Sequence, residues 1–457
     1  MRYWFDLSTS ARWSGHPVGI VRVERELGRR AADRLGASAG FCVYDRQLNN
    51  FHEISAEHAA RIVEGRLQID FVGGGPTPVA DGGLRRRIRN AVLARPRLYQ
   101  QVQRLRGRSF SLEQIAEVRR TEEAQRKATA ASAVETIRFE DIAPEPLALD
   151  QDDVVISAGL DWEYKDLRSI YRLKQARRFR YAAVLYDLIP LLHPHYVVPA
   201  YVHLLRDYFG ELFWVADYCL SISESTQKDM LAYCADQGVA APAADHFPLG
   251  GDLPATGRDA DEPLPAGLQQ VRYGVFVSTI EPRKNHRTLY EAWDRCVREG
   301  RVDPAVNKLV FVGRQGWNVG DLLTEIAANP ATADSIIILS NVSDGVLRRL
   351  YQNADFALFP SHYEGYGLPV AEALSYGKPC ICSGGGSLPE VGGDMVVYCD
   401  PREPAAWAGA IARAFAHPDL LADQSARIRE QYRAVTWDDA AQLFFSRLSA
   451  LVEGDHR

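Results

Sequence analysis

Residues 356–393 read FALFPSHYEGYGLPVAEALSYGKPCICSGGGSLPEVGG. The apolar run at 356–359 has the composition of a short buried strand, and a loop punctuated by glycines follows it. Pro369 suits the first turn of a helix, because its missing N–H would find no partner there, and Gly377 suits the end of that helix. The stretch therefore predicts a strand, a loop and a helix in succession, which is the repeating unit of an α/β fold.

Two glutamates flank the start of this predicted helix. Glu364 lies in the loop, and Glu372 lies about one turn inside the helix. At the carboxyl ends of parallel strands, a helix N-terminus offers free N–H groups and a partial positive charge to a phosphate. Carboxylates repel a phosphate, so they suit such a place if they accept hydrogen bonds from sugar hydroxyls. The pattern predicts a nucleotide-sugar site, and a loop charge beside a helix-surface charge is the alternative interpretation.

Apolar segments with β character alternate with helix-periodic segments along the whole chain. The first series predicts strands at residues 3–5, 154–156, 181–186 and 218–222, with a helix at 20–31. The second series predicts strands at 273–278, 309–312, 336–339 and 356–359, with helices from 286, at 320–328, at 344–352 and from 369. Each series is typical of a parallel sheet wrapped by crossover helices, so the fold class is α/β.

The composition also divides the chain into domains. Residues 253–270 are rich in proline, glycine and aspartate without apolar periodicity, which predicts a linker. We therefore expect an N-terminal Rossmann-like domain at 1–252 and a C-terminal nucleotide-sugar-binding domain at 271–435. Residues 436–457 begin with capping residues and continue with apolar residues at helical spacing, which predicts a terminal helix that docks back on the protein.

In two stretches of its C-terminal half, the chain resembles the GT-B glycosyltransferases of the retaining family 4. Glu364 and Glu372 match the E-x7-E element of that family, and FVSTIEPRKNH at 276–286 resembles the first strand, loop and helix of its donor domain. The resemblance implies two Rossmann-like domains that face a cleft. It also implies that Lys284 and Arg283 hold the donor diphosphate, that Glu364 lies near the sugar hydroxyls and that Glu372 binds the ribose. We expect Glu364, Lys284 and Arg283 to be the catalytic residues.

The same resemblance implies further donor contacts. Those expected to contact the diphosphate through their backbone amides are Gly365, Tyr366, Gly367 and Leu368. Asn341 and Val342 lie in a segment that resembles the lining of the nucleobase pocket, although Ser343 beside them is equally suited to capping a helix. Many family members carry an arginine near the position of Ser278, so this chain departs from the pattern there and has fewer cations for the diphosphate.

The N-terminal half carries weaker matches. Residues 216–225 resemble the ADxxxxxSExS element of the family, and residues 185–190 resemble its HD loop. Tyr186 stands where that loop usually has histidine and Asp187 follows it, so we expect both on the acceptor side of the cleft. Histidines at 193 and 195 are alternatives for the missing imidazole, although loop histidines more often have no such role.

The first helix begins with a further motif. Residues 17–24 resemble the GIxRVE signature of family members that build bacterial O-antigen and related surface polysaccharides. Gly19 would let the backbone approach the donor phosphate. Arg22 would reach the cleft on the acceptor side, and a charge on the exposed face of a helix is the alternative interpretation.

The overall composition excludes several classes of protein. A net charge of −6 is unlike the basic footprint of a dedicated nucleic-acid binder. The seven cysteines form no CxxC pair, and two DxD triplets, at 150–152 and 259–261, lie before a strand and in the linker. We therefore expect no metal and no cofactor. No apolar run is long enough to cross a bilayer, so a cytoplasmic protein is expected.

Residues 84–127 differ from the rest of the chain in charge. They hold twelve arginines and one lysine against four glutamates, a net charge of +9 in a chain whose total is −6. Two main hypotheses fit this segment, which is predicted as a basic insertion in the first domain. It is a pair of solvated helices, or a face that attracts anionic lipid and makes the protein peripheral on the cytoplasmic side of the inner membrane. Contact with nucleic acid is the remaining alternative.

The leading hypothesis is a retaining, metal-independent hexosyltransferase. It would move a hexose or deoxyhexose from a GDP-, dTDP- or UDP-linked donor to a growing glycan or a polyprenyl-diphosphate-linked acceptor in surface-polysaccharide (O-antigen, lipopolysaccharide) biosynthesis. The donor would bind the C-terminal domain and the acceptor the N-terminal domain. The alternatives are a GT-B-fold nucleotide-sugar epimerase and a catalytically silent GT-B scaffold.

Overall fold

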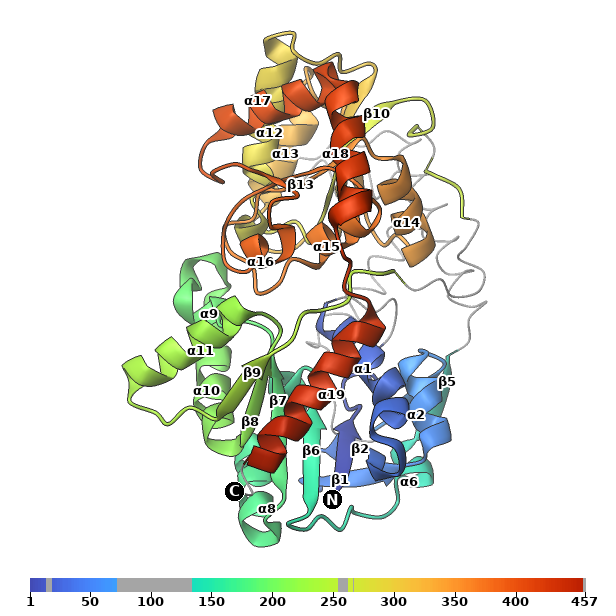
Figure 1. Ribbon diagram of the computed structural model, residues 1–457, viewed down its shortest axis with the longest axis vertical. Helices are drawn as coiled ribbons and strands as arrows, with labels where there is room; N and C mark the ends of the chain where they lie inside the picture. Colours follow the sequence, from blue (N-terminus) through green and yellow to red (C-terminus); the bar gives the residue numbers. More distant parts are fainter. Residues whose placement is uncertain (14–18, 72–133, 254–261, 266, 455–457) are drawn as a thin grey trace, which may run out of the picture.

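The computed structural model describes residues 1–13, 19–71, 134–253, 262–265 and 267–454. Figure 1 shows two α/β domains, one above the other, with the chain passing between them near residue 250 and again before the last helix. The predicted basic insertion at 84–127 lies outside the described residues, as does part of the predicted linker at 253–270.

The N-terminal domain is built on a seven-stranded sheet in the order β3-β2-β1-β6-β7-β8-β9, in which only the β2–β3 pair is antiparallel. Its strands are β1 (Arg2–Asp6), β2 (Ala39–Asp45), β3 (Asn50–Ile54), β6 (Asp153–Ser157), β7 (Arg180–Leu185), β8 (Tyr218–Ser221) and β9 (Ala243–His246). The main helices are α1 (Ile20–Leu35), α2 (Ala56–Val63), α8 (Leu167–Arg177), α10 (Pro199–Val215) and α11 (Glu224–Gln237). Shorter elements are β4 (Leu67–Asp70), β5 (Glu135–Arg138), α6 (Phe139–Ile142), α7 (Asp161–Tyr164) and α9 (Ile189–Leu192).

The C-terminal domain is built on a six-stranded parallel sheet in the order β12-β11-β10-β13-β14-β15. Its strands are β10 (Arg272–Val277), β11 (Asn307–Val312), β12 (Ile336–Leu339), β13 (Phe356–Phe359), β14 (Cys380–Cys382) and β15 (Val397–Tyr398). Its helices are α12 (His286–Arg298), α13 (Gly320–Ala328), α14 (Asp344–Asn353), α15 (Leu368–Ser375), α16 (Leu388–Gly392), α17 (Pro404–Ala416) and α18 (Pro418–Gln431).

Both sheets are doubly wound, and this topology determines which loops lie next to each other at the carboxyl ends of the strands. In the first sheet the strand order reverses between β1 and β6, and in the second it reverses between β10 and β13. Loops that leave two such strands diverge to opposite faces and open a crevice at their carboxyl ends. The loops after β10 and β13 are the ones that carry Lys284 and Glu364.

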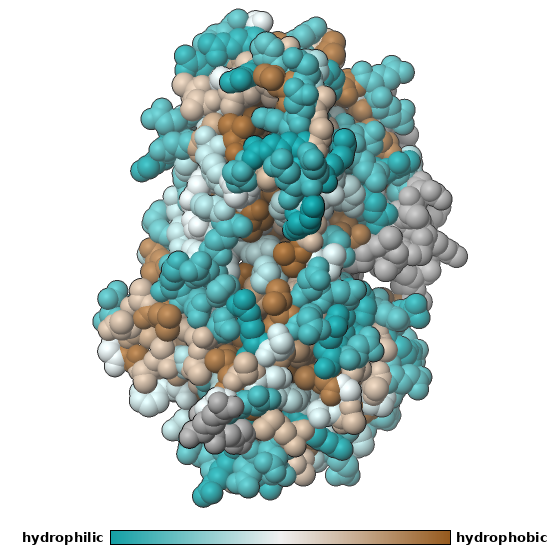
Figure 2. Space-filling view, in the orientation of Figure 1, coloured by the Kyte–Doolittle hydropathy of each residue, from teal (hydrophilic) through white to brown (hydrophobic). Residues whose placement is uncertain are grey.

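The last helix, α19 (Trp437–Gly454), returns to the N-terminal domain and packs beside α1 (Figure 1). Its buried face includes Phe444, whose ring lies 5.0 Å from that of Phe247, and Phe445, whose ring lies 6.4 Å from that of Phe5. The two crossing segments are also joined, because Gly251 N–H donates to the Val435 carbonyl at 2.9 Å. Figure 2 shows hydrophobic side chains in the waist between the domains, while hydrophilic side chains cover most of the rest of this face.

Candidate active site at the domain interface

The loop after β10 holds its two basic residues in a fixed turn. Residues Pro282–Lys284 form a single 3-10 turn, and Asn285 follows with φ 59°, a left-handed conformation that asparagine tolerates. The Asn285 amide donates to the carbonyl of Pro360 at 3.2 Å and to that of Pro401 at 2.7 Å. These bonds tie the loop to the end of β13, so that Arg283 and Lys284 face the loop that carries Glu364.

Glu364 is the centre of a buried ion cluster. Its carboxylate accepts from Lys284 Nζ at 2.6 Å and forms an ion pair with Arg283 Nη1 at 2.8 Å, while Arg283 also pairs with Glu281 at 3.0 Å. Burial by itself would raise the pKa of Glu364, but the charges of Arg283 and Lys284 outweigh burial and lower the pKa to about 2. Burial also lowers the pKa of Lys284 and raises that of Glu281. The three residues predicted to be catalytic therefore lie together, with Glu281 as an additional member that the sequence reasoning missed.

The glycine loop that follows Glu364 lies against the N-terminal domain. A Cβ on Gly365 would stand 2.3 Å from the Tyr186 carbonyl oxygen, so only glycine fits there. The Gly365 carbonyl accepts from the hydroxyls of Ser223, at 2.7 Å, and Thr226, at 3.2 Å, both at the start of α11. Gly367 then begins α15 with φ 106°, which glycine adopts without strain. The structure thus places the loop at the contact between the two domains.

Helix α15 begins one residue earlier than the sequence predicted, at Leu368, and Pro369 takes its second position. Pro369 has no amide hydrogen, so this N-terminus has one fewer donor for an anion than an ordinary helix. Leu368 is partly exposed.

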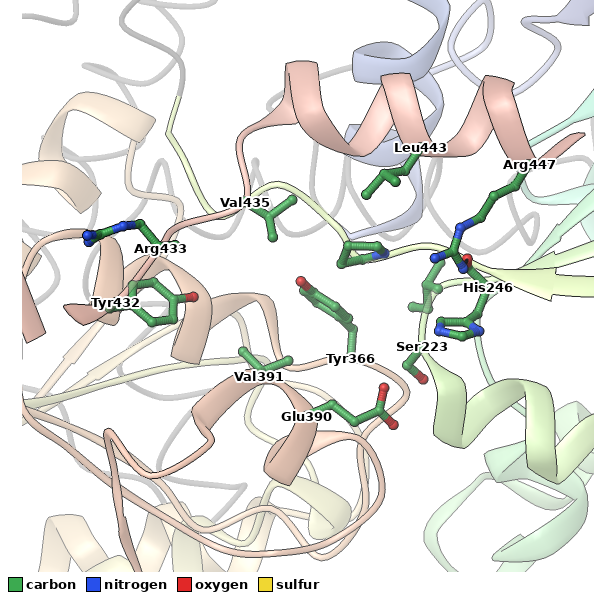
Figure 3. A pocket seen from close by; sticks show the side chains of 12 residues that line it. Ser223, His246, Tyr366, Glu390, Val391, Tyr432, Arg433, Val435, Leu443 and Arg447 are labelled. Atoms are coloured by element: carbon green, nitrogen blue, oxygen red, sulfur yellow. Dashed lines mark hydrogen bonds between the residues drawn. The ribbon is translucent and has the colours of Figure 1, made fainter. Parts of the chain in front are cut away.

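Tyr366 turns its side chain away from Glu364. Its hydroxyl donates to the Leu249 carbonyl at 2.8 Å, so only its backbone remains for the predicted donor contact. The ring lines a cavity of about 360 Å³ between the two crossing segments of the chain (Figure 3). The residues around this cavity are Ile222, Ser223, His246, Pro248, Tyr366, Glu390, Val391, Tyr432, Arg433, Val435, Leu443 and Arg447.

Glu390, at the rim of this cavity, links the domains. Its carboxylate accepts from the backbone N–H groups of Glu224 and Ser225 at 2.9 and 2.7 Å, and so caps α11 of the N-terminal domain. In Figure 3 its carboxylate points toward Ser223 at the start of that helix.

Glu372, the second predicted carboxylate, is also buried at the domain contact. Its Oε1 accepts from Arg22 Nη1 at 3.1 Å and its Oε2 accepts from the Tyr351 hydroxyl at 2.9 Å. Burial raises the pKa of Glu372, and the charge of Arg22 opposes part of that rise. Arg22 also pairs with Asp344 at 2.6 Å. Arg22, predicted on the acceptor side, therefore contacts the carboxylate that was predicted to bind the ribose.

The segment predicted to line the nucleobase pocket lies between β12 and α14. Asn341 is exposed with φ 56°, and Val342 is partly buried. Ser343 caps α14 by accepting from the Val346 N–H at 3.1 Å, as its alternative interpretation predicted, and its hydroxyl donates to Glu262 at 2.6 Å. Asp344, the next residue, was not predicted as a site residue, although an acidic residue after a strand's carboxyl end is a signal that could have found it.

Two of the remaining predicted N-terminal residues, Tyr186 and Asp187, border the same contact. The Tyr186 hydroxyl donates to the Ala158 carbonyl at 2.5 Å, and Asp187 accepts from the Ile189 N–H at 3.0 Å. Burial raises the pKa of Asp187, and the charge of Arg283 opposes the rise. Gly19 precedes α1 with φ 51°, and the ring of His193 lies 4.6 Å from that of Tyr363 in the C-terminal domain.

Within the described ranges, no group of three or more metal-ligating side chains could hold a metal ion. The first DxD triplet forms a turn, in which Asp152 N–H donates to Asp150 at 2.8 Å, and the second lies outside the described residues. No described helix combines the length and the apolarity that a membrane crossing requires.

Two facing doubly wound domains with a site at their contact define the GT-B class of glycosyltransferases. Two solved structures show the same fold. Sucrose-phosphate synthase from Thermosynechococcus elongatus aligns with a TM-score of 0.59 at 16% identity, covering 99% of both chains. Anabaena Alr3699/HepE, in complex with UDP and glucose, aligns with a TM-score of 0.55 at 13% identity, covering 98% of this chain and 99% of that one.

Sequence comparison identifies the C-terminal domain more closely. Residues 268–431 match the family of glycosyl transferases group 1. The serotype-specific mannosyltransferase WbdA of Escherichia coli is 28% identical over 319 residues, covering 67% of this chain and 38% of that protein. The O-antigen chain mannosyltransferase B of E. coli is 34% identical over 167 residues, covering 36% of this chain and 43% of that one. The matches thus span less than half the length of these relatives.

Proposed function

We propose that this chain is a glycosyltransferase that moves a hexose or deoxyhexose from a nucleotide sugar to a growing glycan or a polyprenyl-diphosphate-linked acceptor in bacterial surface-polysaccharide biosynthesis. The observation that carries the proposal is the placement of Glu364 between Arg283 and Lys284, beside the N-terminal domain. The cations suit a diphosphate and the carboxylate suits sugar hydroxyls. Mannose is the first sugar to test, because the E. coli relatives are named as mannosyltransferases.

The proposed reaction retains the configuration of the sugar and uses no metal. The bond between the sugar C1 and the diphosphate oxygen breaks, and a bond between C1 and the acceptor oxygen forms on the same face. The proton of the acceptor hydroxyl passes to the departing diphosphate. Arg283 and Lys284 stabilise the charge that develops on that diphosphate, so the protein contributes positioning and electrostatic stabilisation.

The first test is a thermal-shift panel of GDP, UDP and dTDP with the full chain, because a ligand that binds the folded state raises its melting temperature. Turnover is then measured with the matching sugar donor and an acceptor extract. We expect Lys284→Ala to lower turnover by about a hundredfold or more. Arg287→Ala is the matched control, since Arg287 lies exposed on the next helix and pairs only at the surface. Near-normal turnover in Lys284→Ala would contradict the proposal.

One observation favours a second candidate, the catalytically silent GT-B scaffold. Tyr186 stands where the resembling family has histidine, and its hydroxyl is already bonded to the Ala158 carbonyl. A silent protein would bind a nucleotide and turn over no donor. An epimerase would convert the donor without any acceptor, so nucleotide binding together with turnover measured both with and without the acceptor extract separates all three functions.

We also propose that the basic segment at 84–127 contacts anionic lipid, on the ground of its net charge of +9. Sedimentation of the full chain with phosphatidylglycerol vesicles should show binding that falls as salt rises. Absence of binding at low salt would remove this part of the proposal.

A further inference from the structure

An arginine of the N-terminal domain is inserted between two carboxylates of the C-terminal domain. Arg22 lies on the first turn of α1 and is 6% exposed. One of its terminal nitrogens donates to Glu372 at 3.1 Å and the other donates to Asp344 at 2.6 Å. Asp344 begins α14 and Glu372 lies within α15, so a single guanidinium joins three helices across the domain contact.

This contact closes Glu372 to any other ligand. One carboxylate oxygen is held by Arg22 and the other by the Tyr351 hydroxyl, and the residue is 5% exposed. A ribose that bonds to Glu372 must therefore displace one of these two partners. Tyr351 is 1% exposed within the core of the C-terminal domain, whereas Arg22 reaches Glu372 from the other domain at the end of a long, flexible side chain. Arg22 is the partner that can leave.

The loop expected to hold the diphosphate has little free positive charge in this state. Its two cations, Arg283 and Lys284, face the carboxylates of Glu281 and Glu364 at 2.6 to 3.0 Å. Asp187 is a third carboxyl group close enough for the charges of Arg283 and Lys284 to act on it. A diphosphate carries negative charge on each phosphate, so its binding needs a cation beyond this pair.

We propose that Arg22 is a donor-binding residue: when the ribose hydroxyls bind Glu372, the Arg22 guanidinium leaves that carboxylate and donates to the adjoining diphosphate. The proposal rests on the proposed function, because it requires a nucleotide diphosphate in this site. Ribose and 5′-diphosphate belong to one nucleotide and are close neighbours. A flexible arginine that starts at the ribose-binding carboxylate therefore has the diphosphate within its range, and its planar group can hold phosphate oxygens in pairs.

The competing explanation is that Arg22 only ties the domains together. The two explanations predict opposite effects when the guanidinium is removed. If Arg22 only links the two domains, its loss frees Glu372. A nucleoside and the matching nucleoside diphosphate should then both bind as tightly as before, or more tightly. If Arg22 moves to the diphosphate, its loss should weaken the diphosphate alone.

The experiment is calorimetric titration of the full chain with three pairs of ligands: GDP and guanosine, UDP and uridine, and dTDP and thymidine. The proteins are the wild type, Arg22→Gln, Arg22→Lys and the control Arg29→Gln, whose arginine lies on the same helix and pairs with Glu26 of that helix. We expect Arg22→Gln to weaken binding of the preferred diphosphate by about tenfold or more. Binding of the matching nucleoside should stay equal or tighten, Arg22→Lys should recover part of the loss, and Arg29→Gln should match the wild type.

Two results would overturn the inference, and they differ in what else they overturn. If the wild type binds a nucleoside diphosphate and Arg22→Gln binds it equally or more tightly, Arg22 only links the two domains, and the proposed function still stands. If the wild type binds none of GDP, UDP and dTDP, the proposed function fails and the inference fails with it. Donor turnover gives a second measurement, in which the inference requires Arg22→Gln to lower kcat as well as raise KM.

Discussion

Replacing Glu364 with glutamine tests the buried ion cluster most directly. Glutamine has nearly the shape of glutamate, so the change removes a charge while it preserves packing. Arg283 and Lys284 would then face each other with only Glu281 to balance them. A buried pair that loses one partner leaves an uncompensated charge, which is strongly destabilising.

The size of the effect follows from the pKa. A fall from 4.5 to about 2 corresponds to roughly 3 kcal/mol of stabilisation of the ionised carboxylate in the folded protein. Because the folded pKa is the lower one, this stabilisation is fully present above pH 4.5 and is lost as the pH falls toward 2. We therefore expect Glu364→Gln to lower the free energy of unfolding at pH 7 by roughly 3 kcal/mol, and by less as the pH falls below 4.5.

The assay is urea unfolding of the full chain between pH 3 and pH 7. The control is Glu325→Gln, because Glu325 is an exposed carboxylate that pairs with Arg287 at 3.0 Å. This substitution should lower the free energy of unfolding by about 0.5 kcal/mol or less. A second readout is GDP or UDP affinity, which should rise in Glu364→Gln because both cations are freed, while donor turnover falls. If Glu364→Gln is as stable as the control at pH 7 and binds nucleotide more weakly, the charge assignment is wrong.

Three further predictions concern other parts of the structure. Burial, and to a smaller extent the charge of Asp6, raises the pKa of Glu24 from 4.5 to about 8. Folding therefore favours the protonated form of Glu24, and the stabilisation that this gives is present below pH 4.5 and is lost as the pH rises toward 8. Glu24→Gln should therefore raise the melting temperature at pH 8 and leave it unchanged at pH 4, and equal shifts at both values would contradict this. Gly365→Ala should lower turnover by about tenfold or more, because its Cβ would stand 2.3 Å from the Tyr186 carbonyl, whereas Gly409→Ala, with open space around it, should not. Phe444→Ala should cost about 3 kcal/mol in urea unfolding, because Phe444 is 1% exposed between α19 and the N-terminal sheet, and a loss under about 1 kcal/mol would show that the helix docks by other contacts.

The local elements were largely readable from the sequence. Strand 356–359 and helix 320–328 were predicted with the bounds that the structure has, because buried strands and amphipathic helices leave a periodic pattern in the residues themselves. Helix α1 continues four residues beyond the predicted 31, to Leu35, because nothing in residues 32–35 breaks a helix and Gly36 ends it. The GT-B fold followed from the resemblance at Glu364 and Glu372.

The ion pairs of the site were not readable in that way. Lys284 and Glu364 are 80 positions apart, and Arg22 and Glu372 are 350 apart. Asp344 and Glu281 were not predicted as site residues, although both lie in segments whose neighbours were. For Tyr366 the sequence predicted a backbone contact only, and it gave no sign that the hydroxyl donates to the Leu249 carbonyl or that the ring lines the cavity between the crossing segments.

The sequence by itself determined the two series of strands and helices, the loops at their carboxyl ends and the acidic and basic residue types placed there. Only the tertiary structure decided which of these charges meet, that Arg22 lies between Asp344 and Glu372 and that Glu390 caps a helix of the opposite domain. The physical reason is that periodicity reports burial of each residue within its own element. An ion pair between domains depends on how the two folded domains are placed relative to each other, and no local sequence pattern contains that information.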